Sequence, residues 1–131
     1  MTSPVNILLS GLNAASLRAS ASANNIANSR STTKLEDGKV QNEVYMPQDV
    51  ISVNQQNGGT LATVIASDKP PLKVYEPGHV DADINGVVEM PNVDLAEELV
   101  NLEQAASDYK ANLKALESYK NTQQSLLDIF V

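Results

Sequence analysis

The 131-residue chain contains no cysteine and no tryptophan, and it has only one phenylalanine and one histidine. The absence of cysteine excludes disulfides, zinc–thiolate sites and cysteine nucleophiles. Because no run of about 20 apolar residues occurs, we expect no direct membrane span. The first residues also lack the basic and apolar regions of a cleavable secretory signal. Nine Lys and Arg against 16 Asp and Glu give a net charge of −7, which argues against nucleic acid as a partner because phosphate binding requires clustered basic residues.

The charge is divided unevenly between the two ends of the chain. Residues 1–35 carry a net charge of +3, whereas residues 93–131 carry a net charge of −4. Opposite charges favour packing of the two terminal segments against each other or against neighbouring molecules. This contribution is modest where the charges stay solvated.

The clearest positive feature is an apolar repeat, at alternating spacings of four and three residues, in the last third of the chain. Its positions are Leu95, Leu99, Leu102, Ala106, Tyr109, Leu113, Leu116, Lys120, Gln123, Leu127 and Phe130. A weaker repeat opens the chain at Val5, Leu8, Leu12, Ala15, Ala19, Ser22 and Ile26. About five heptads are more than a small domain needs to cover one core. We therefore expect two long amphipathic helices whose seams pack against copies of this chain or its relatives.

Two polar residues, Lys120 and Gln123, interrupt the C-terminal repeat. Polar residues at seam positions weaken packing but fix the register between helices. Alternatively, the seam ends near Leu116 and the tail packs elsewhere. The sequence favours neither interpretation over the other.

The N-terminal helix is predicted to begin at Pro4, with the Ser3 hydroxyl as its cap, and to end near Asn28. Its polar face carries serine and asparagine in place of the usual Glu and Lys, at Ser10, Asn13, Ser16, Ser20, Asn24 and Asn25. Because serine and asparagine are mediocre helix formers, this helix should depend on packing for its stability.

Between the two helical segments the pattern changes to that of short strands. After a predicted turn at Asp37–Gly38, alternating residues favour strands near residues 40–44 and 50–52. A turn signal at residues 57–59 is followed by predicted strands over residues 60–66, 72–75 and 86–90. The middle of the chain is therefore expected to be a small β-rich insert.

The C-terminal helix is predicted to follow Pro91, with Asn92 or Asp94 as its cap and Glu97 and Glu98 in its first turn. The predicted fold is mainly α with a small β-rich insert. Residues 1–30 form the N-terminal helix of a helical core, residues 31–91 the insert and its connecting turns, and residues 92–131 the C-terminal helix. The two terminal helices are expected to pair in a coiled-coil-like bundle.

One local motif matches the opening of a calcium-binding EF-hand loop, with Asp81, Asp83 and Asn85 followed by Gly86. Such a loop needs a bidentate Glu at its twelfth position, which here is Asn92, and a helix on its entry side. The residues before Asp81 include Pro77 and Gly78 and cannot form that helix. An acidic turn is the favoured interpretation, and a calcium-dependent binding module is the alternative.

The single histidine, His79, is the only obvious candidate for a general base. It lies in a Pro-Gly turn, and the chain has no cysteine for it to activate and no serine in a nucleophile motif. A turn-stabilising role is therefore favoured over catalysis. The sequence predicts no catalytic residues, no cofactor site and no metal site.

Two stretches resemble bacterial flagellar basal-body rod proteins, and within that family chiefly the proximal rod proteins. The first is Ser10-Gly11-Leu12-Asn13-Ala14-Ala15 followed by Ala23 to Asn28. The second comprises Val74 to Gly86, Val88 to Asp94 and Glu97 to Val100, and it continues at Ala105 to Asn112. The family-motif residues are Asn25, Ile26, Ala27, Asn28, Pro77, Gly78, Asp81, Asp83, Asn85, Gly86, Met90, Pro91 and Asn92. The distal rod and hook proteins resemble the termini but carry much longer inserts.

The resemblance implies a structural, non-enzymatic protein. Its terminal helices would pack with those of neighbouring subunits, both copies of itself and other rod proteins, into a hollow helical rod that transmits torque. The β insert would lie outside that helical core. The resemblance further implies passage through the flagellar type III export apparatus without cleavage of a signal peptide, and a final place in the basal-body rod within the periplasmic space.

Overall fold

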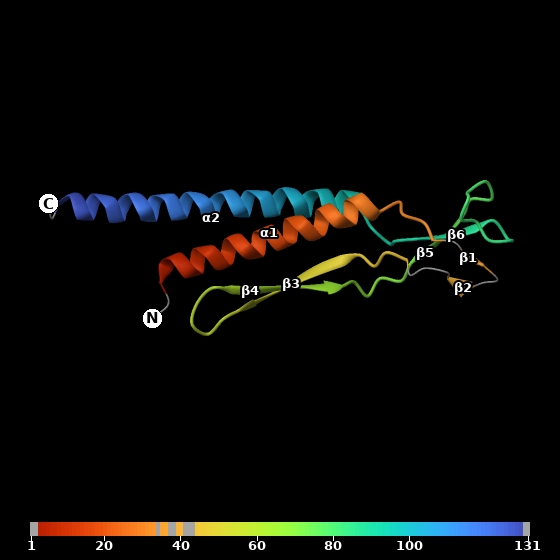
Figure 1. Ribbon diagram of the computed structural model, residues 1–131, viewed down its shortest axis with the longest axis horizontal. Helices are drawn as coiled ribbons and strands as arrows, with labels where there is room; N and C mark the ends of the chain where they lie inside the picture. The colour runs from red at the N-terminus through yellow and green to blue at the C-terminus, as the bar shows by residue number, and fades with distance from the viewer. Residues whose placement is uncertain (1–2, 34, 37–38, 41–43, 130–131) are drawn as a thin grey trace.

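The computed structural model describes residues 3–33, 35–36, 39–40 and 44–129. In this part of the chain two helices, α1 (Pro4–Asn28) and α2 (Leu95–Ile129), lie side by side and run in opposite directions (Figure 1). The predicted pairing of the terminal helices is confirmed. Coiled-coil geometry between them is not shown.

The start of α1 confirms the predicted boundary but not the predicted cap. The helix begins at Pro4, whose fixed backbone angle suits the first helical position. The Ser3 side chain makes no capping hydrogen bond; instead the Ser3 carbonyl oxygen accepts from the amides of Asn6 at 2.9 Å and Ile7 at 3.3 Å. The prediction that the Ser3 hydroxyl caps the helix is therefore wrong.

The start of α2 settles the choice between the two candidate caps. Asp94 Oδ1 accepts hydrogen bonds from the amides of Ala96 at 2.9 Å and Glu97 at 3.3 Å. Glu97 and Glu98 occupy the first turn, where their charges interact favourably with the helix dipole. Asp94, not Asn92, is the cap.

Six strands pair as three antiparallel hairpins in the described residues. They are β1 (Leu35–Glu36) with β2 (Lys39–Val40), β3 (Gln48–Asn54) with β4 (Thr60–Ala66), and β5 (Leu72–Tyr75) with β6 (Val87–Met90). The β-rich insert and the strands at residues 60–66 and 72–75 are confirmed. The first predicted strand is wrong at its end, because Val44 is buried outside any strand. The predicted Asp37–Gly38 turn lies outside the described residues.

Helix α1 is the middle layer of the elongated molecule, with α2 on one side and the β3–β4 hairpin on the other (Figure 1). Two neighbouring pairs in α1, Ala14 with Ala15 and Ala21 with Ser22, are buried at both members. Since consecutive helical residues point about 100° apart, burial of both members requires packing on more than one side. The small side chains of α1 allow this close approach on both sides.

The β5–β6 hairpin lies beyond the C-terminal end of α1 (Figure 1). It is joined to the segment that follows α1 by a bridge between Thr33 and Glu89, with the Thr33 amide 3.3 Å from the Glu89 carbonyl oxygen. Val88 is fully buried here. Neither helix, over its described residues, has an apolar stretch long enough to cross a lipid bilayer.

Candidate assembly surfaces

Asn25 joins α1, α2 and the β3–β4 hairpin through four hydrogen bonds. Its side chain is fully buried. Oδ1 accepts from the Gln48 amide at 2.7 Å and from the Tyr45 hydroxyl at 2.9 Å. Nδ2 donates to the Gln48 carbonyl oxygen at 2.9 Å and to Glu98 Oε1 at 2.6 Å. The side-chain amide therefore pairs with the Gln48 backbone as a neighbouring strand would, and its full bonding capacity is used.

The hydrogen-bonded group around Asn25 also affects the ionisation of Tyr45. Burial of the phenol, followed by the nearby negative charge of Glu98, raises the pKa of Tyr45. Both effects disfavour the phenolate. Tyr45 therefore remains a hydrogen-bond donor to Asn25 across the neutral pH range.

A second contact holds the turn of the β3–β4 hairpin against the first turns of α1. The Ser10 hydroxyl donates to the Ile7 carbonyl oxygen at 2.7 Å and accepts from the Thr60 amide at 3.0 Å. Gly59 has φ +93°, and a Cβ there would lie 2.6 Å from Ser10 Oγ. Only glycine fits this turn, because a side chain would be strained and would clash with α1.

The α1–α2 contact is close and partly polar. A Cβ on Gly11 would lie 2.8 Å from Asn112 Oδ1, so glycine permits this approach of the helices. Arg18 Nη2 bonds to Asp108 Oδ2 at 2.8 Å. Since both side chains are more than a third exposed, this ion pair contributes less than about 1 kcal/mol. It fixes orientation more than it stabilises the fold.

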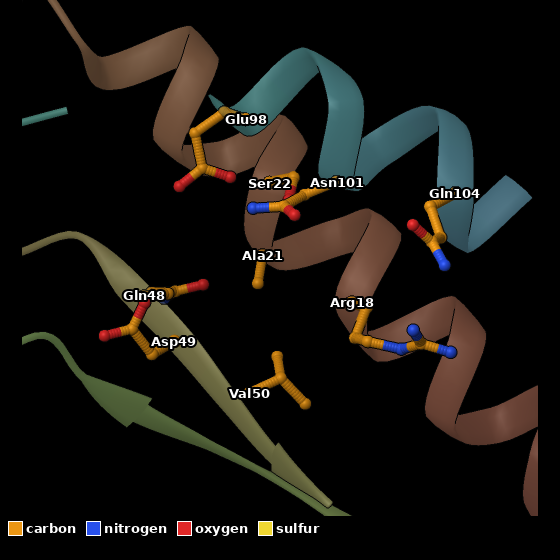
Figure 2. A pocket seen from close by; sticks show the side chains of 9 residues that line it. All are labelled: Arg18, Ala21, Ser22, Gln48, Asp49, Val50, Glu98, Asn101 and Gln104. Atoms are coloured by element: carbon orange, nitrogen blue, oxygen red, sulfur yellow. The ribbon is translucent and has the colours of Figure 1, made fainter. Parts of the chain in front are cut away.

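A cavity of about 420 Å³ lies beside these contacts, between α1, α2 and β3. Figure 2 shows Glu98, Asn101 and Gln104 extending from α2, while Gln48 and Asp49 lie on β3 across from α1. Arg18 Nε is buried there without a hydrogen-bond partner among the described residues. The mixed charges of the lining select no particular ligand.

The predicted seam on α1 lies at the packed side of that helix. Leu12, Ala15 and Ser22 are buried, and Val5, Leu8, Ala19 and Ile26 are partly buried. Two residues assigned to the polar face, Ser10 and Asn25, bond to the hairpin from positions that are partly or fully buried, whereas Asn24 bonds to Gln48 but stays exposed. That assignment is wrong for those two positions because α1 packs on two sides.

The predicted seam on α2 is only partly covered within one chain. Leu102, Ala106 and Leu116 are partly buried on the side that includes the fully buried Ala105. The other seam residues described are between 40% and 64% exposed, namely Leu95, Leu99, Tyr109, Leu113 and Leu127. Phe130 lies outside the described residues. The apolar stripe of α2 is thus wider than its contact with α1.

The two polar interruptions of the seam lie where α1 begins. Lys120 and Gln123 line a shallow groove together with Val5, Leu116 and Tyr119. Gln123 Nε2 donates to the Tyr119 hydroxyl at 2.9 Å. Their role in fixing register stays a prediction, as does the alternative that the seam ends near Leu116.

The family-motif residues after β5 form a tightly bonded loop. Asp83 Oδ1 accepts from the amides of Asn85 and Val87, each at 2.8 Å. The Thr32 hydroxyl donates to Asp81 Oδ2 at 2.5 Å, which ties the loop to the segment after α1. Gly86 has φ +76°, and a Cβ there would lie 2.8 Å from the Pro77 Cβ. The motif therefore specifies the shape of this turn.

The Asp83 carboxylate should titrate below the ordinary range for aspartate. The hydrogen bond from the Val87 amide is the main cause, and it lowers the Asp83 pKa from its ordinary value of 3.8 despite some desolvation. A depressed folded-state pKa means that the contribution of Asp83 is present above the unfolded value of about 3.9 and is lost as pH falls through the folded value. Carboxyl ¹³C NMR titration should show a midpoint below 3.8, and amide protection at Asn85 and Val87 should fall with the same midpoint. A midpoint at or above the ordinary value would contradict this account of the loop.

Nothing in the described residues supports the calcium alternative. No three His, Cys, Asp or Glu side chains there converge as metal ligands. His79 Nδ1 accepts a hydrogen bond from the Asp81 amide at 3.2 Å, and its 3.8 Å separation from Asp81 Oδ2 is too long for a hydrogen bond. The Asp83 carboxylate is engaged by loop amides. His79 thus stabilises a turn, as the favoured interpretation expects.

Sequence reasoning identified Asn25 only as part of a family motif and did not predict its four bonds. Asn25 lies beside Asn24, which is exposed, and spacing alone does not distinguish them. The partners Tyr45, Gln48 and Glu98 are distant in sequence. The best available signal was the placement of an asparagine near the end of a helix with no acidic or basic residue around it.

The family model and the individual relatives that match this chain are all flagellar basal-body rod proteins. The family model for the C-terminal region of the flagellar basal body rod proteins FlgE, FlgF and FlgG matches residues 84–129. A flagellar basal-body rod protein FlgC of Salmonella typhimurium is 39% identical over 86% of this chain and 84% of its own length. The FlgC of Borreliella burgdorferi is 36% identical over 97% of this chain and 95% of its own length, and that of Agrobacterium fabrum is 30% identical over 92% and 88%. These identities extend over most of both chains, and they show that this chain belongs to the FlgC family of flagellar basal-body rod proteins.

Proposed function

We propose that this chain is a structural subunit of the proximal rod of the bacterial flagellar basal body. The observation that carries the proposal, beyond family membership, is the partly uncovered apolar stripe of α2. The stripe runs along the helix that already pairs with α1, and its residues Leu99 and Leu113 remain exposed. An exposed apolar stripe along a long helix is typical of a surface that another chain covers.

The layered protomer suits a load-bearing subunit. Asn25, at one end of α1, and Ser10, near the other end, each bond α1 to the β3–β4 hairpin. Arg18 and Asp108 join α1 to α2 between those ends. A protomer fixed at several points along its length resists sliding of its layers, which is what transmission of torque requires.

In the proposed assembly, the terminal helices pack with those of copies of this chain and of other rod proteins to build a hollow helical drive shaft. The domain division at residues 1–30, 31–91 and 92–131 describes this arrangement, with the insert outside the helical core. Export through the flagellar type III apparatus without cleavage, and a final place in the periplasmic part of the basal body, belong to the same proposal. Family membership supports it. No catalytic activity is proposed.

The function is tested by electron microscopy of basal bodies from a strain that lacks this gene. Membrane rings without a rod are expected, and the intact gene supplied in trans should restore rods. A tagged chain should also be recovered in purified basal bodies. Complete rods and normal filaments in the deletion strain would overturn the proposal.

A further inference from the structure

The β3–β4 hairpin carries a second exposed apolar surface, on the face turned away from α1. The register pairs Asp49 with Ile65, Ile51 with Thr63 and Val53 with Leu61. These six residues share one face because side chains alternate along a strand. The four large aliphatic residues, Ile51, Val53, Leu61 and Ile65, are between 41% and 58% exposed. We call this face the outer hairpin face.

This exposure is unusual for a two-stranded sheet. A hairpin is marginally stable in water unless one of its faces packs on another element, and here the inner face already packs on α1. The outer hairpin face therefore does not need aliphatic residues to hold the hairpin in place. A contiguous aliphatic patch on a surface that the fold leaves open marks a contact with another molecule.

The chain cannot cover this face with its own uncovered α2 stripe. Helix α1 lies between α2 and the hairpin (Figure 1), so α2 of the same chain does not reach the outer hairpin face. We infer that the outer hairpin face of one copy receives the α2 stripe of a second copy, around the exposed Leu99 and Leu113 and the partly buried Ala106 between them. This inference rests on the proposed rod function and specifies one of its contacts.

The dimensions of the two surfaces match. The aliphatic residues of the outer hairpin face extend over four residue steps, from Leu61 to Ile65, or about 13 Å at 3.3 Å per residue. From Leu99 to Leu113 the α2 stripe extends over about 21 Å at 1.5 Å per residue. The helix is therefore long enough to cover the hairpin completely. Small Ala106 at the middle of the stripe permits the close approach that alanines of α1 already make on the inner face.

Charge favours one orientation of the contact. Asp49 is the only charged residue among the outer-face positions and lies at one end of them, where it also borders the cavity beside α1. Exposed Lys110 and Lys114 flank Leu113 near one end of the α2 stripe, with Glu117 a turn farther on. Placing the Asp49 end of the hairpin at Leu113 pairs Asp49 with the two lysines.

The proposed contact is asymmetric, which determines the kind of assembly it makes. Each copy offers the outer hairpin face to one neighbour and the α2 stripe to another. Such a head-to-tail contact propagates into a ring or an open helix, whereas a contact between identical surfaces closes as a dimer. Hairpin-to-hairpin contact is the competing arrangement.

The natural absence of cysteine makes disulfide trapping a clean test. Thr63 lies at the middle of the outer hairpin face and Ala106 at the middle of the α2 stripe, and a cysteine at either position leaves the aliphatic residues unchanged. Full-length T63C and A106C chains with different tags are produced together with the unmodified chain, and basal bodies are purified under mild oxidation. Because a disulfide needs Cβ atoms about 4 Å apart, the mixed pair should form at least about tenfold more dimer than T63C with S107C. Ser107 is the matched control because it is an exposed neighbour of Ala106 that lies about 100° around the helix from it.

A second pair, D49C with K114C, tests the charged end of the contact and uses two exposed positions that the fold does not depend on. Mixed dimers in either pair support the inference. Dimers of T63C with itself would overturn it in favour of hairpin-to-hairpin contact, and so would the absence of dimers when both variants are present in basal bodies. If both variants are present in basal bodies but form no dimers, the inference fails and the proposed rod function stands. If the unmodified chain itself is missing from basal bodies, the rod function and the inference fail together.

Discussion

Replacing Asn25 with aspartate is expected to lower the free energy of unfolding by about 3–5 kcal/mol at pH 7, because it leaves an uncompensated charge in a fully buried site. The substitution keeps the shape of the side chain but removes both N–H donors. The new carboxylate oxygen would face the Gln48 carbonyl oxygen and Glu98 Oε1, the latter at 2.6 Å. N25A should cost about 2–4 kcal/mol, since it removes the partners of the buried Gln48 backbone groups. Urea unfolding of the full chain, followed by circular dichroism, measures both values.

The N25D variant should also acquire a characteristic pH dependence. Burial and the neighbouring Glu98 charge would raise the folded-state pKa of the new carboxyl above its unfolded value of about 3.9. The deficit relative to the natural chain should therefore be smallest at low pH and grow as pH rises through the raised pKa.

Asn24 supplies the matched control for both measurements. It lies next to Asn25 in α1, is exposed, and makes one long side-chain hydrogen bond, at 3.3 Å, to Gln48 Oε1. N24D should change the free energy of unfolding by less than about 0.5 kcal/mol, with no comparable pH dependence. Equal losses for N24D and N25D would show that Asn25 does not act through its buried bonds.

Replacing Leu113 with aspartate is expected to reduce incorporation into the rod by at least about tenfold while the folded chain is retained. Leu113 is 40% exposed in the single chain, so the new charge stays solvated there and loses its water only when a neighbour covers the stripe. Export should continue, because the substitution changes one exposed residue of α2 and no residue of α1. The measurements are the amount of the chain in purified basal bodies, the amount exported, and the helical circular dichroism signal.

The control for this prediction is S107D, which adds the same charge to the same helix at an exposed position that is not part of the seam. It should be incorporated as the natural chain is. Leu102 is a poorer probe than Leu113 because it is already partly buried in the single chain, and a charge there would destabilise the helix pair directly. Normal rods built from L113D chains would remove the α2 stripe from the proposed function.

The boundaries of the helices were predictable because local signals determine them. Pro4 fits the first position of α1, and Asp94 binds the free amides at the start of α2. The turn at Gly59 and the strand that follows it were likewise predictable from the residue types at neighbouring positions. These features depend on residues only a few positions apart, which a sequence presents directly.

The arrangement of layers was not predictable in the same way. The periodicity of α1 indicated one packed side, whereas Ala14 and Ala21 show a second one against the hairpin. Alanine and serine suit a buried contact and an exposed surface almost equally, so their pattern carries little information about a second neighbour. The bonds of Asn25 depend on Tyr45, Gln48 and Glu98, whose approach requires the complete fold.

Helix α2 is longer than the helix it pairs with, and this difference has a mechanical consequence. The groove at Val5 places the first turn of α1 beside residues 116–123, and residues 121–128 are all exposed. At 1.5 Å per residue, those eight residues extend about 12 Å. In a stack of such protomers, the two helices of each protomer end at different heights along the stack. A cross-section at the end of α1 therefore still contains the continuous backbone of α2. Torque applied to the stack would therefore act on the covalent backbone of α2 as well as on the side-chain contacts between protomers.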